Sequence, residues 1–349
     1  MKAVIDDKIP YIREAAARLF DETVYLPGSA IGPGDVKDAD VLIVRTRTRC
    51  DYDLLAASRV RFVATATIGY DHLDTLFLEE AGIGWANCPG CNASSVGQYV
   101  ENCLLYLRQA GLPLLQRQDL TVGIIGAGHV GLQVREHLQG RFRLLLNDPP
   151  RQRAEGRAGF ADLDQVAREC DIITFHTPLT HHGPDATYHL ADSAFMGRLR
   201  RRPLIINAAR GGVVDEAALL QALDDGRVGG AVIDTWEHEP HISRRLLDRA
   251  LLATPHIAGY SADGKTHAAR MALEAVADYF GLTCSIHIEP PALPPDMEIP
   301  ADEAGRKLAL YNPARDSAAL KAAPEDFELL RGNYPLRRES FGPSALPFS

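Results

Sequence analysis

Three side chains of different chemistry follow apolar runs in the second half of the 349-residue chain: Arg210, Glu239 and His256. An arginine can bind a carboxylate through two hydrogen bonds and polarise a nearby carbonyl group. A histidine can take a hydroxyl proton, and a carboxylate beside it stabilises the imidazolium and orients the ring. This combination suits hydride removal from C2 of a 2-hydroxy acid, so we expect the three residues to be catalytic. Taken singly, each is more often a solvated charge or an ordinary polar side chain, so the prediction depends on a cofactor motif earlier in the chain.

That motif begins where the apolar run 122–125 leads into Gly126-Ala-Gly128-His-Val-Gly131. The run predicts a buried strand, and the apolar spacing after Gly131 predicts a helix. Gly126 would allow a tight turn, Gly128 a close approach of the backbone to a pyrophosphate, and Gly131 close packing of the helix on the strand. The alternative is a glycine turn in an unrelated α/β protein, because the glycine pattern alone is a weak signal.

The context of the turn favours a dinucleotide. Asp148 ends the next predicted strand, near the spacing expected for a carboxylate that binds ribose hydroxyls. The helix that follows the turn would present free N–H groups and its positive dipole end to the phosphates. Because a carboxylate at the ribose repels a 2′-phosphate, we expect the cofactor to be NAD rather than NADP.

Apolar strands and helices alternate along the chain and must position these residues. We expect strands at 2–5, 41–44, 61–64, 83–86, 122–125, 144–148, 171–175, 203–207, 230–234 and 251–253, and long helices at 94–110 and 261–281. Near-continuous apolar strands predict parallel sheets covered on both faces. The expected fold class is α/β, with two doubly wound parallel-sheet domains (Rossmann-like or flavodoxin-like) and a small C-terminal segment. Ligands of such sheets bind at the carboxyl ends of the strands.

Composition excludes several classes of protein. The net charge of −9 argues against non-specific binding to nucleic acid, and no apolar run approaches the length of a membrane span. The six cysteines are scattered, as in a reduced cytoplasmic protein. Cys88-Pro-Gly-Cys91 lacks a second ligand pair at matching spacing, so we expect no metal.

The segment Arg45-Thr-Arg-Thr-Arg49 suggests an anionic ligand. It follows a predicted strand, and alternate residues of an extended segment point to the same side, so its arginines could share a face. This favours a phosphorylated substrate, with Thr46, Thr67 and Tyr260 as hydroxyl donors. The alternative is a solvated, charged loop.

Taken together, the motifs resemble those of the D-isomer-specific 2-hydroxyacid dehydrogenase family. The resemblance covers roughly residues 1–283 and rests on residues 126–131, 176–179, 206–215, 234–240 and 254–259. It implies an NAD-dependent oxidoreductase that acts on a CH–OH group, with a split substrate domain (1–95 and 262–285), an inserted NAD domain (96–261), a cleft between them, and a homodimer. It assigns Arg210 to the substrate carboxylate, Glu239 as the partner of the acid/base His256, and the following residues to NAD: Gly126, Gly128, His129, Val130, Gly131, Asp148, Thr177, Ala208, Ala209, Arg210, Asp234 and Gly259.

Residues 286–349 resemble a C-terminal dimerisation domain found in this family, through the stretch 333–339. They are too poor in apolar residues to fold alone, so we expect them to pack against the body of the chain or a partner chain. We expect Arg45 to bind the substrate phosphate, and Arg337 or Arg338 to reach the same phosphate from the other subunit; the alternative is that Arg337 and Arg338 form a solvated surface pair. Two other functions remain open. The substrate could be another 2-hydroxy acid, such as phosphoglycerate or glyoxylate, or the chain could be a corepressor-like protein that binds NAD as a sensor.

Overall fold

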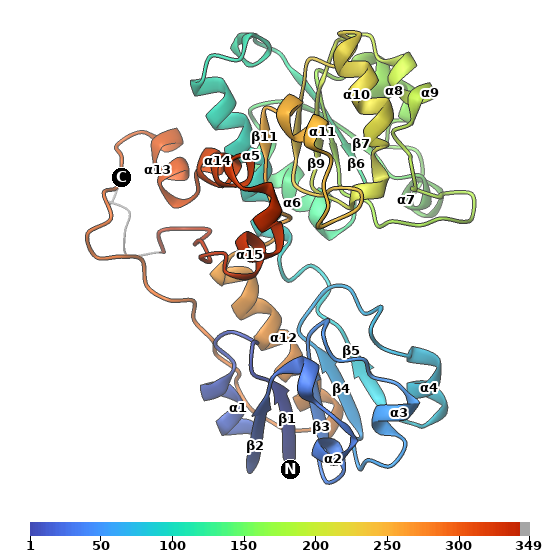
Figure 1. The fold of residues 1–349 in the computed structure, drawn as a ribbon, viewed down its shortest axis with the longest axis vertical. Helices are drawn as coiled ribbons and strands as arrows, with labels where there is room; N and C mark the ends of the chain where they lie inside the picture. The colour runs from blue at the N-terminus through green and yellow to red at the C-terminus, as the bar shows by residue number, and fades with distance from the viewer. Residues whose placement is uncertain (343–349) are drawn as a thin grey trace. The chain divides into compact units, whose positions relative to one another are not determined.

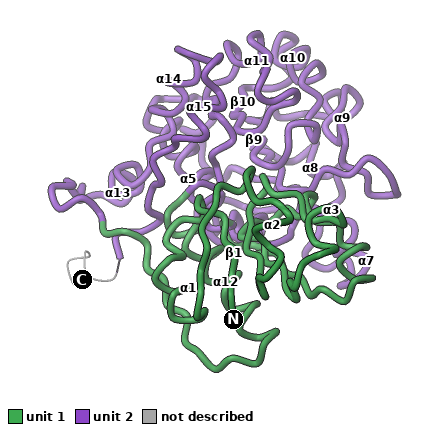
Figure 2. Tube along the Cα trace, turned by 60° about the horizontal axis from the view of Figure 1, so that its bottom comes forward, with its two compact units in different colours: residues 1–92, 261–292 green, residues 93–260, 293–349 purple. Residues whose placement is uncertain are grey.

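The computed structural model describes residues 1–342, which form two compact units (Figure 2). Unit 1 contains residues 1–92 and 261–292, and unit 2 contains residues 93–260 and the described part of 293–349. The boundaries expected near residues 95 and 262 lie close to these. The C-terminal segment, expected as a separate domain from residue 286, instead belongs to unit 2 from Leu293 onward. Its role in dimerisation stays a prediction.

Unit 1 is built on a five-stranded parallel sheet in the order β2-β1-β3-β4-β5 (Figure 1). The strands are β1 (Lys2–Asp6), β2 (Glu22–Leu26), β3 (Val41–Val44), β4 (Phe62–Thr65) and β5 (Gly84–Ala86), and the helices are α1 (Arg13–Leu19), α2 (Pro33–Val36), α3 (Tyr52–Leu55), α4 (Thr75–Glu80) and α12 (Ala262–Phe280), with a 3₁₀ turn at Gly28–Ala30. Apolar residues of α1 and α12 cover one face, and those of α2, α3 and α4 cover the other. The sequence did not predict β2, because this edge strand is only partly buried and lacks a continuous apolar run.

The long helix α12 shows how the sequence sets the ends of an element. Ser261 accepts a hydrogen bond from the backbone N–H of Gly264, and Gly281 ends the helix with a φ of +66°. Ala272, Leu273 and Val276 lie on its buried face in the core of unit 1. The predicted helix over 261–281 is therefore confirmed.

Unit 2 contains a six-stranded parallel sheet in the order β11-β10-β9-β8-β6-β7. Its strands are β6 (Thr121–Ile125), β7 (Arg143–Asn147), β8 (Ile172–Phe175), β9 (Leu204–Asn207), β10 (Gly230–Ile233) and β11 (Leu252–Ala253). Its helices are α5 (Ala93–Gln109), α6 (His129–Leu138), α7 (Pro149–Glu155), α8 (Leu163–Glu169), α9 (Ser193–Arg198), α10 (Glu216–Asp224) and α11 (Arg244–Arg249), with 3₁₀ turns at Pro113–Gln116 and Gly211–Val213. The strand order reverses between β6 and β8, so the glycine turn after β6 lies at the switch point where such sheets bind ligands. The predicted fold class is confirmed.

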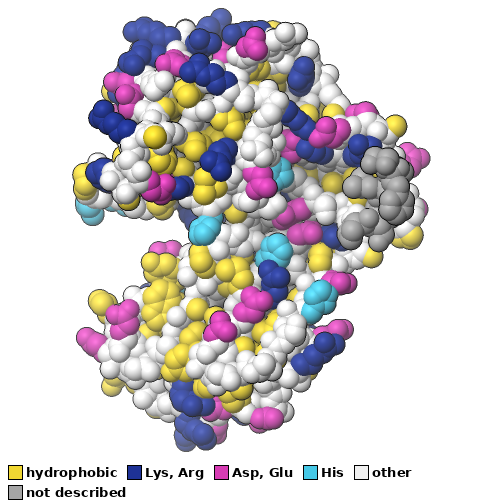
Figure 3. All heavy atoms as spheres, turned by 180° about the vertical axis from the view of Figure 1, so that it is seen from behind, with side chains coloured by type: hydrophobic (Ala, Val, Ile, Leu, Met, Phe, Trp, Pro, Cys, Tyr) yellow, Lys and Arg dark blue, Asp and Glu magenta, His cyan; other side chains and the backbone are white. Residues whose placement is uncertain are grey.

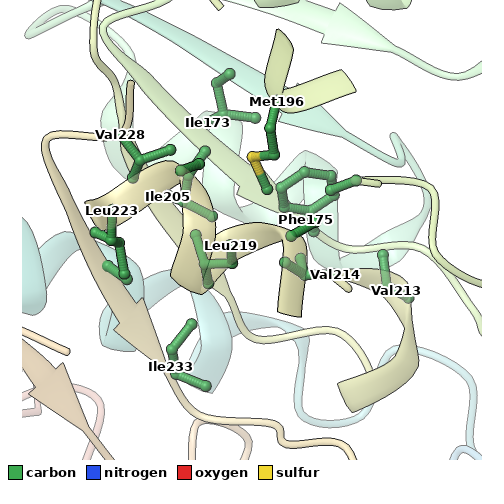
Figure 4. Close-up of a cluster of buried hydrophobic side chains, with 14 of the residues drawn as sticks. Ile173, Phe175, Met196, Ile205, Val213, Val214, Leu219, Leu223, Val228 and Ile233 are labelled. Atoms are coloured by element: carbon green, nitrogen blue, oxygen red, sulfur yellow. The ribbon is translucent and has the colours of Figure 1, made fainter. Parts of the chain in front are cut away.

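Both faces of this sheet are covered. Figure 4 shows one core, in which Ile173, Phe175 and Ile205 of the sheet pack with Leu219 and Leu223 of α10. The other face packs against α5 and α6. These buried strands explain the near-continuous apolar runs of the sequence.

The C-terminal segment folds onto unit 2 through α13 (Glu303–Leu310), α14 (Pro313–Ala322), a 3₁₀ turn (Pro324–Asp326) and α15 (Phe327–Gly332). Leu320 and Phe327 are fully buried in the same core as the sheet residues. The amide of Asn102 donates to the carbonyl oxygens of Lys307 and Tyr311, at 2.9 and 2.6 Å. The segment therefore obtains its apolar core from the body of unit 2.

Surface charge, helix length and the burial of Cys88 and Cys91 relate to the expectations about nucleic acid, membrane and metal. Acidic and basic side chains both occur on the face shown in Figure 3. Among the described residues, no helix combines the length and apolar character that a membrane crossing requires. Cys88 and Cys91 are buried free thiols that pack in the core of unit 1, where burial raises their pKa to about 12 and about 11.

Docking of the C-terminal segment can be tested at Phe327. Phe327→Ala should lower the free energy of unfolding by about 3–5 kcal/mol, because it removes a buried aromatic ring and leaves a cavity. Leu329→Ala is the matched control, because Leu329 in the same helix is 57% exposed and should change stability by less than about 0.5 kcal/mol. Urea unfolding measures the free energy of unfolding of both variants. Equal losses of stability would contradict the burial of Phe327 in the core of unit 2.

Candidate active site

Glu239 and His256 form a hydrogen-bonded pair at the carboxyl edge of the unit 2 sheet. Nδ1 of His256 lies 2.8 Å from Oε2 of Glu239, and Oε1 of Glu239 accepts a hydrogen bond from the N–H of Trp236 at 2.9 Å. With Nδ1 directed at the carboxylate, Nε2 is the nitrogen that can exchange a proton with a substrate. The two side chains are 26% and 17% exposed, so they are partly shielded but accessible.

The environment of Glu239 favours its ionised form. Burial opposes ionisation, but the hydrogen bond and charge of His256, the Trp236 N–H and the charge of Arg331 outweigh it, and the pKa of Glu239 falls below its ordinary value. Nη1 of Arg331 lies 3.9 Å from Oε2 of Glu239. Glu239 thus places a carboxylate that favours its ionised form beside the imidazole, and its role in catalysis stays a prediction.

Asp234 fixes the backbone that carries His256. Its carboxylate is buried and accepts hydrogen bonds from the Thr254 hydroxyl (2.7 Å) and from the N–H groups of Ile257 (2.8 Å) and Ala258 (3.0 Å). His256 itself has a φ of +56°, which is unusual for a residue with a side chain. Asp234 was expected to contact NAD. The structure gives it this internal role, and contact with NAD stays a prediction.

Arg210 follows β9, so the three candidate catalytic residues follow three adjacent parallel strands. Its side chain is exposed, and Nη1 donates to the carbonyl oxygen of Ala209 at 2.7 Å. The next residue, Gly211, lies against the β10 loop so closely that a Cβ there would come within 1.8 Å of the Trp236 oxygen. Glycine at this position therefore brings the Arg210 turn next to the loop that leads to Glu239.

The glycine turn has the geometry of a phosphate cradle. Gly126 has a φ of +89°, and a Cβ on it would approach the His176 oxygen to 2.7 Å. A Cβ on Gly131 would meet the Gly126 oxygen at 1.9 Å, so only glycine allows this packing of α6 on β6. Gly128 caps α6 and has open space beside it, which leaves room for a ligand near the helix N-terminus. His129 and Val130 begin that helix.

Two further side chains near this turn suit a dinucleotide. The carboxylate of Asp148 accepts hydrogen bonds from the N–H of Ala127 (2.9 Å) and of Arg151 (3.0 Å), which holds it beside the glycine turn. The hydroxyl of Thr177 is buried and has no hydrogen-bond partner among the described residues. A buried hydroxyl without a partner costs free energy unless a ligand supplies one. The donor set and the open turn therefore fit NAD.

The remaining candidates of unit 2 lie in the same loops. Ala208 and Ala209 follow β9, and Gly259 and Tyr260 follow His256. Their contacts with NAD or substrate stay predictions.

In unit 1, the predicted substrate-binding residues follow the adjacent strands β3 and β4. Arg45 donates to the carbonyl oxygen of Lys8 at 2.8 Å, Thr46 is exposed, and the Thr67 hydroxyl lies 2.7 Å from that of Thr65.

The expected alternation of the three arginines was wrong, because the segment turns after Arg45. The N–H of Thr48 approaches the Arg45 oxygen at 3.4 Å, which closes the turn. Arg49 pairs with Asp51 at 2.8 Å and has a 75% exposed side chain. The three side chains are therefore not arranged along one extended face.

The geometry of Arg337 differs from both expectations for this residue, contact with the substrate phosphate of another subunit and a solvated position at the surface. Arg337 is 7% exposed and donates hydrogen bonds to oxygen atoms within its own unit, among them the Ile257 and Tyr260 carbonyls. A guanidinium enclosed in this way is neither a solvated surface group nor directed at a second subunit.

The sequence also gave no indication that Arg331 lies beside Glu239. The two residues are far apart in the chain, so no local pattern connects them.

Comparison with known proteins places this geometry in a family. A family model described as "D-isomer specific 2-hydroxyacid dehydrogenase, NAD binding domain" matches residues 98–258. Full-length relatives extend the match over 97% of the chain. The chain belongs to the D-isomer-specific 2-hydroxyacid dehydrogenase family.

Within that family, the similar curated relatives are erythronate-4-phosphate dehydrogenases. The protein of this name from Bacteroides thetaiotaomicron is 51% identical over 340 residues, which are 97% of each chain. The one from Porphyromonas gingivalis is 43% identical over 350 residues, covering 97% of this chain and 94% of the relative.

Solved structures support the fold. A D-lactate dehydrogenase from Treponema pallidum aligns with a TM-score of 0.64 at 24% identity, covering 83% of this chain and 100% of that one. A D-mandelate dehydrogenase from Rhodotorula graminis aligns with the same TM-score of 0.64 at 19% identity, covering 83% and 99%.

The role of Asp148 can be tested through cofactor preference. Asp148→Ala should lower kcat/KM for NAD roughly tenfold or more, because a hydrogen bond to a charged group contributes about 1.5–3 kcal/mol. It should also raise use of NADP relative to NAD, because the repulsion of the 2′-phosphate disappears while Arg151 remains. Steady-state kinetics with both cofactors measures the ratio.

The control separates this effect from loss of a helix cap, because Asp148 also caps α7. Asp162→Ala removes the equivalent cap of α8 and should leave the NAD/NADP ratio unchanged. An unchanged ratio in Asp148→Ala would show that Asp148 does not contact the ribose.

Proposed function

We propose that this chain catalyses the NAD-dependent oxidation of 4-phospho-D-erythronate at C2, giving 3-hydroxy-2-oxo-4-phosphobutanoate, in the biosynthesis of pyridoxal 5′-phosphate. The Glu239–His256 pair carries the proposal, because it supplies the proton acceptor that the reaction needs. The substrate is proposed from the erythronate-4-phosphate dehydrogenase that shares 51% identity over 97% of the chain.

In this reaction Arg210 binds the substrate carboxylate through a two-pronged hydrogen bond and stabilises charge on the adjacent oxygen. Nε2 of His256 takes the proton of the C2 hydroxyl as the C2–H bond breaks and the carbonyl forms. The ionised Glu239 stabilises the resulting imidazolium and prevents the ring from rotating. Bound NAD⁺ would supply the acceptor for the hydride that leaves C2.

The residues proposed to hold NAD belong to unit 2. The backbone at Gly126, Gly128 and Gly131 would receive the pyrophosphate, and Asp148 would accept hydrogen bonds from the ribose hydroxyls. The Thr177 hydroxyl would find its missing partner on the cofactor.

A substrate phosphate carries nearly two negative charges and accepts several hydrogen bonds. We assign its recognition, and that of the neighbouring hydroxyls, to Arg45, Thr46, Thr67 and Tyr260. Arg45 uses one nitrogen on the Lys8 carbonyl, and a guanidinium has five N–H donors in all.

We also propose that the chain acts as a homodimer in the cytoplasm and does not bind nucleic acid. Free cysteines suit a reducing compartment, and the net charge of −9 disfavours a polyanion.

The substrate assignment predicts a ranking. With NAD⁺, 4-phospho-D-erythronate should give a kcat/KM at least about 10²-fold above D-erythronate, because loss of the phosphate leaves a cationic site without its partner. Oxidation of 3-phospho-D-glycerate, and reduction of glyoxylate with NADH, should also be slower. Equal rates with and without the phosphate would refute the assignment. Binding of NADH without turnover of any substrate would instead indicate a sensor.

The catalytic role of His256 predicts that His256→Asn lowers kcat by roughly 10²–10⁴-fold while NADH binding is nearly unchanged. Asparagine tolerates the positive φ of +56° at this position, so the backbone should be preserved. His189→Asn is a matched control, because His189 has a φ of +51° and is paired with Glu237 at 2.8 Å. The assignment fails if His256→Asn retains more than about a tenth of wild-type kcat.

A further inference from the structure

The buried side chain of Arg337 is surrounded by oxygen atoms of unit 2. Nη1 donates to the carbonyl oxygens of Ile257 and Tyr260, each at 3.0 Å, and Nη2 donates to that of Ala258 at 2.5 Å. The same guanidinium donates to the backbone carbonyl oxygen of Ser95 (3.2 Å), to Oε1 of Gln98 (2.9 Å) and to the Tyr334 hydroxyl (3.3 Å). Every nitrogen of the group is thus engaged.

Aromatic rings complete the environment of this charge. The guanidinium carbon lies 4.0 Å from the ring centroid of Tyr311 and 5.9 Å from that of Tyr334. Burial of a cation is costly unless hydrogen bonds and nearby electron-rich groups replace water. A planar fork with five donors can satisfy oxygen atoms in several directions, which a lysine ammonium at the same place cannot.

Three of the four backbone carbonyl groups that Arg337 binds, those of Ile257, Ala258 and Tyr260, lie just after His256 in the chain. Asp234 binds the N–H groups of Ile257 and Ala258 at 2.8 and 3.0 Å. The loop is therefore held through its N–H groups by an anion and through its carbonyl oxygens by a cation. His256 needs such support, because its positive φ persists only where surrounding contacts determine it.

We propose that Arg337 is a positioning residue for catalysis, which acts within its own chain by holding the 257–260 loop so that His256 meets the substrate hydroxyl. This proposal rests on the proposed function of His256. It assigns the C-terminal segment a part in catalysis that needs no contact between Arg337 and the substrate. Misplacement of a catalytic group by about 1 Å can cost roughly 10²-fold in rate.

The experiment compares Arg337→Ala, Arg337→Lys and a control, Lys307→Met, in the full chain with 4-phospho-D-erythronate and NAD⁺. Lys307 anchors the same segment to Glu101, away from the loop. We expect kcat to fall roughly 10–100-fold in both Arg337 variants, with a smaller change in KM. We expect Lys307→Met to lower the unfolding temperature, because it removes a partner of the buried Glu101 carboxylate. The kcat of this control should stay within about twofold of wild type, because Lys307 is paired with Glu101 and not with the 257–260 loop.

Two readouts distinguish positioning from general stabilisation. Millimolar guanidinium should restore part of kcat in Arg337→Ala but not in His256→Asn, because it can replace the missing fork. In the double variant, Arg337→Ala should cost little beyond His256→Asn alone, because residues that act through one group are not additive. If Arg337→Ala unfolds under assay conditions, Arg337→Lys and its double variant provide the same comparison.

The outcomes separate the two proposals. Wild-type kcat in folded Arg337 variants, or fully additive losses with His256→Asn, would overturn the positioning role and leave the proposed function intact. Failure of wild-type protein to turn over any 2-hydroxy acid, or full activity of His256→Asn, would overturn the proposed function first.

Discussion

The candidate active site of unit 2 depends on one buried carboxylate. Asp234 is 1% exposed and accepts hydrogen bonds from Thr254 and from the N–H groups of Ile257 and Ala258. Burial raises its pKa, and these hydrogen bonds limit the rise. Without this acceptor, each buried donor would be left without a hydrogen bond, at a cost of about 1–3 kcal/mol of stability. The loop conformation that carries His256 is therefore set by satisfaction of backbone hydrogen bonds, and the imidazole position follows from it.

The parallel sheet explains why residues far apart in sequence meet at this loop. Strands β9, β10 and β11 are neighbours, and their carboxyl ends lie at one edge. Arg210, Glu239 and His256 each follow one of these strands. Close backbone packing then sets their spacing, as at Gly211, where any side chain would collide with the Trp236 backbone. The sheet brings the loops together, and glycine at position 211 lets the Arg210 turn lie directly against the loop that leads to Glu239.

Most of the strands, the glycine turn and the placement of each catalytic candidate after a strand were predictable, because they depend on local sequence patterns. A buried strand needs a continuous apolar run, and the turn needs glycine at fixed positions. The conformation at Arg45 was not predictable in this way, since alternation assumes an extended backbone and the chain turns there. Edge strand β2 was missed for a related reason, because its residues are only partly buried. Arg337 was misassigned because a charged residue is expected at the surface, and only the tertiary structure supplies the oxygen atoms that solvate it.

The C-terminal segment shows how a stretch too short for its own core can still affect an active site. One of its helices, α14, supplies a hydrogen-bond acceptor to the edge of the unit 2 sheet. The Ser317 hydroxyl accepts a hydrogen bond from the N–H of Ala253 in the edge strand β11 at 3.0 Å. Phe327 fills the core beneath α15, and Arg331 of that helix lies beside Glu239. Through Arg331, the docked segment therefore also borders the Glu239–His256 pair. One helix, α15, therefore carries both Phe327, which fills the core, and Arg331, which adjoins the candidate active site.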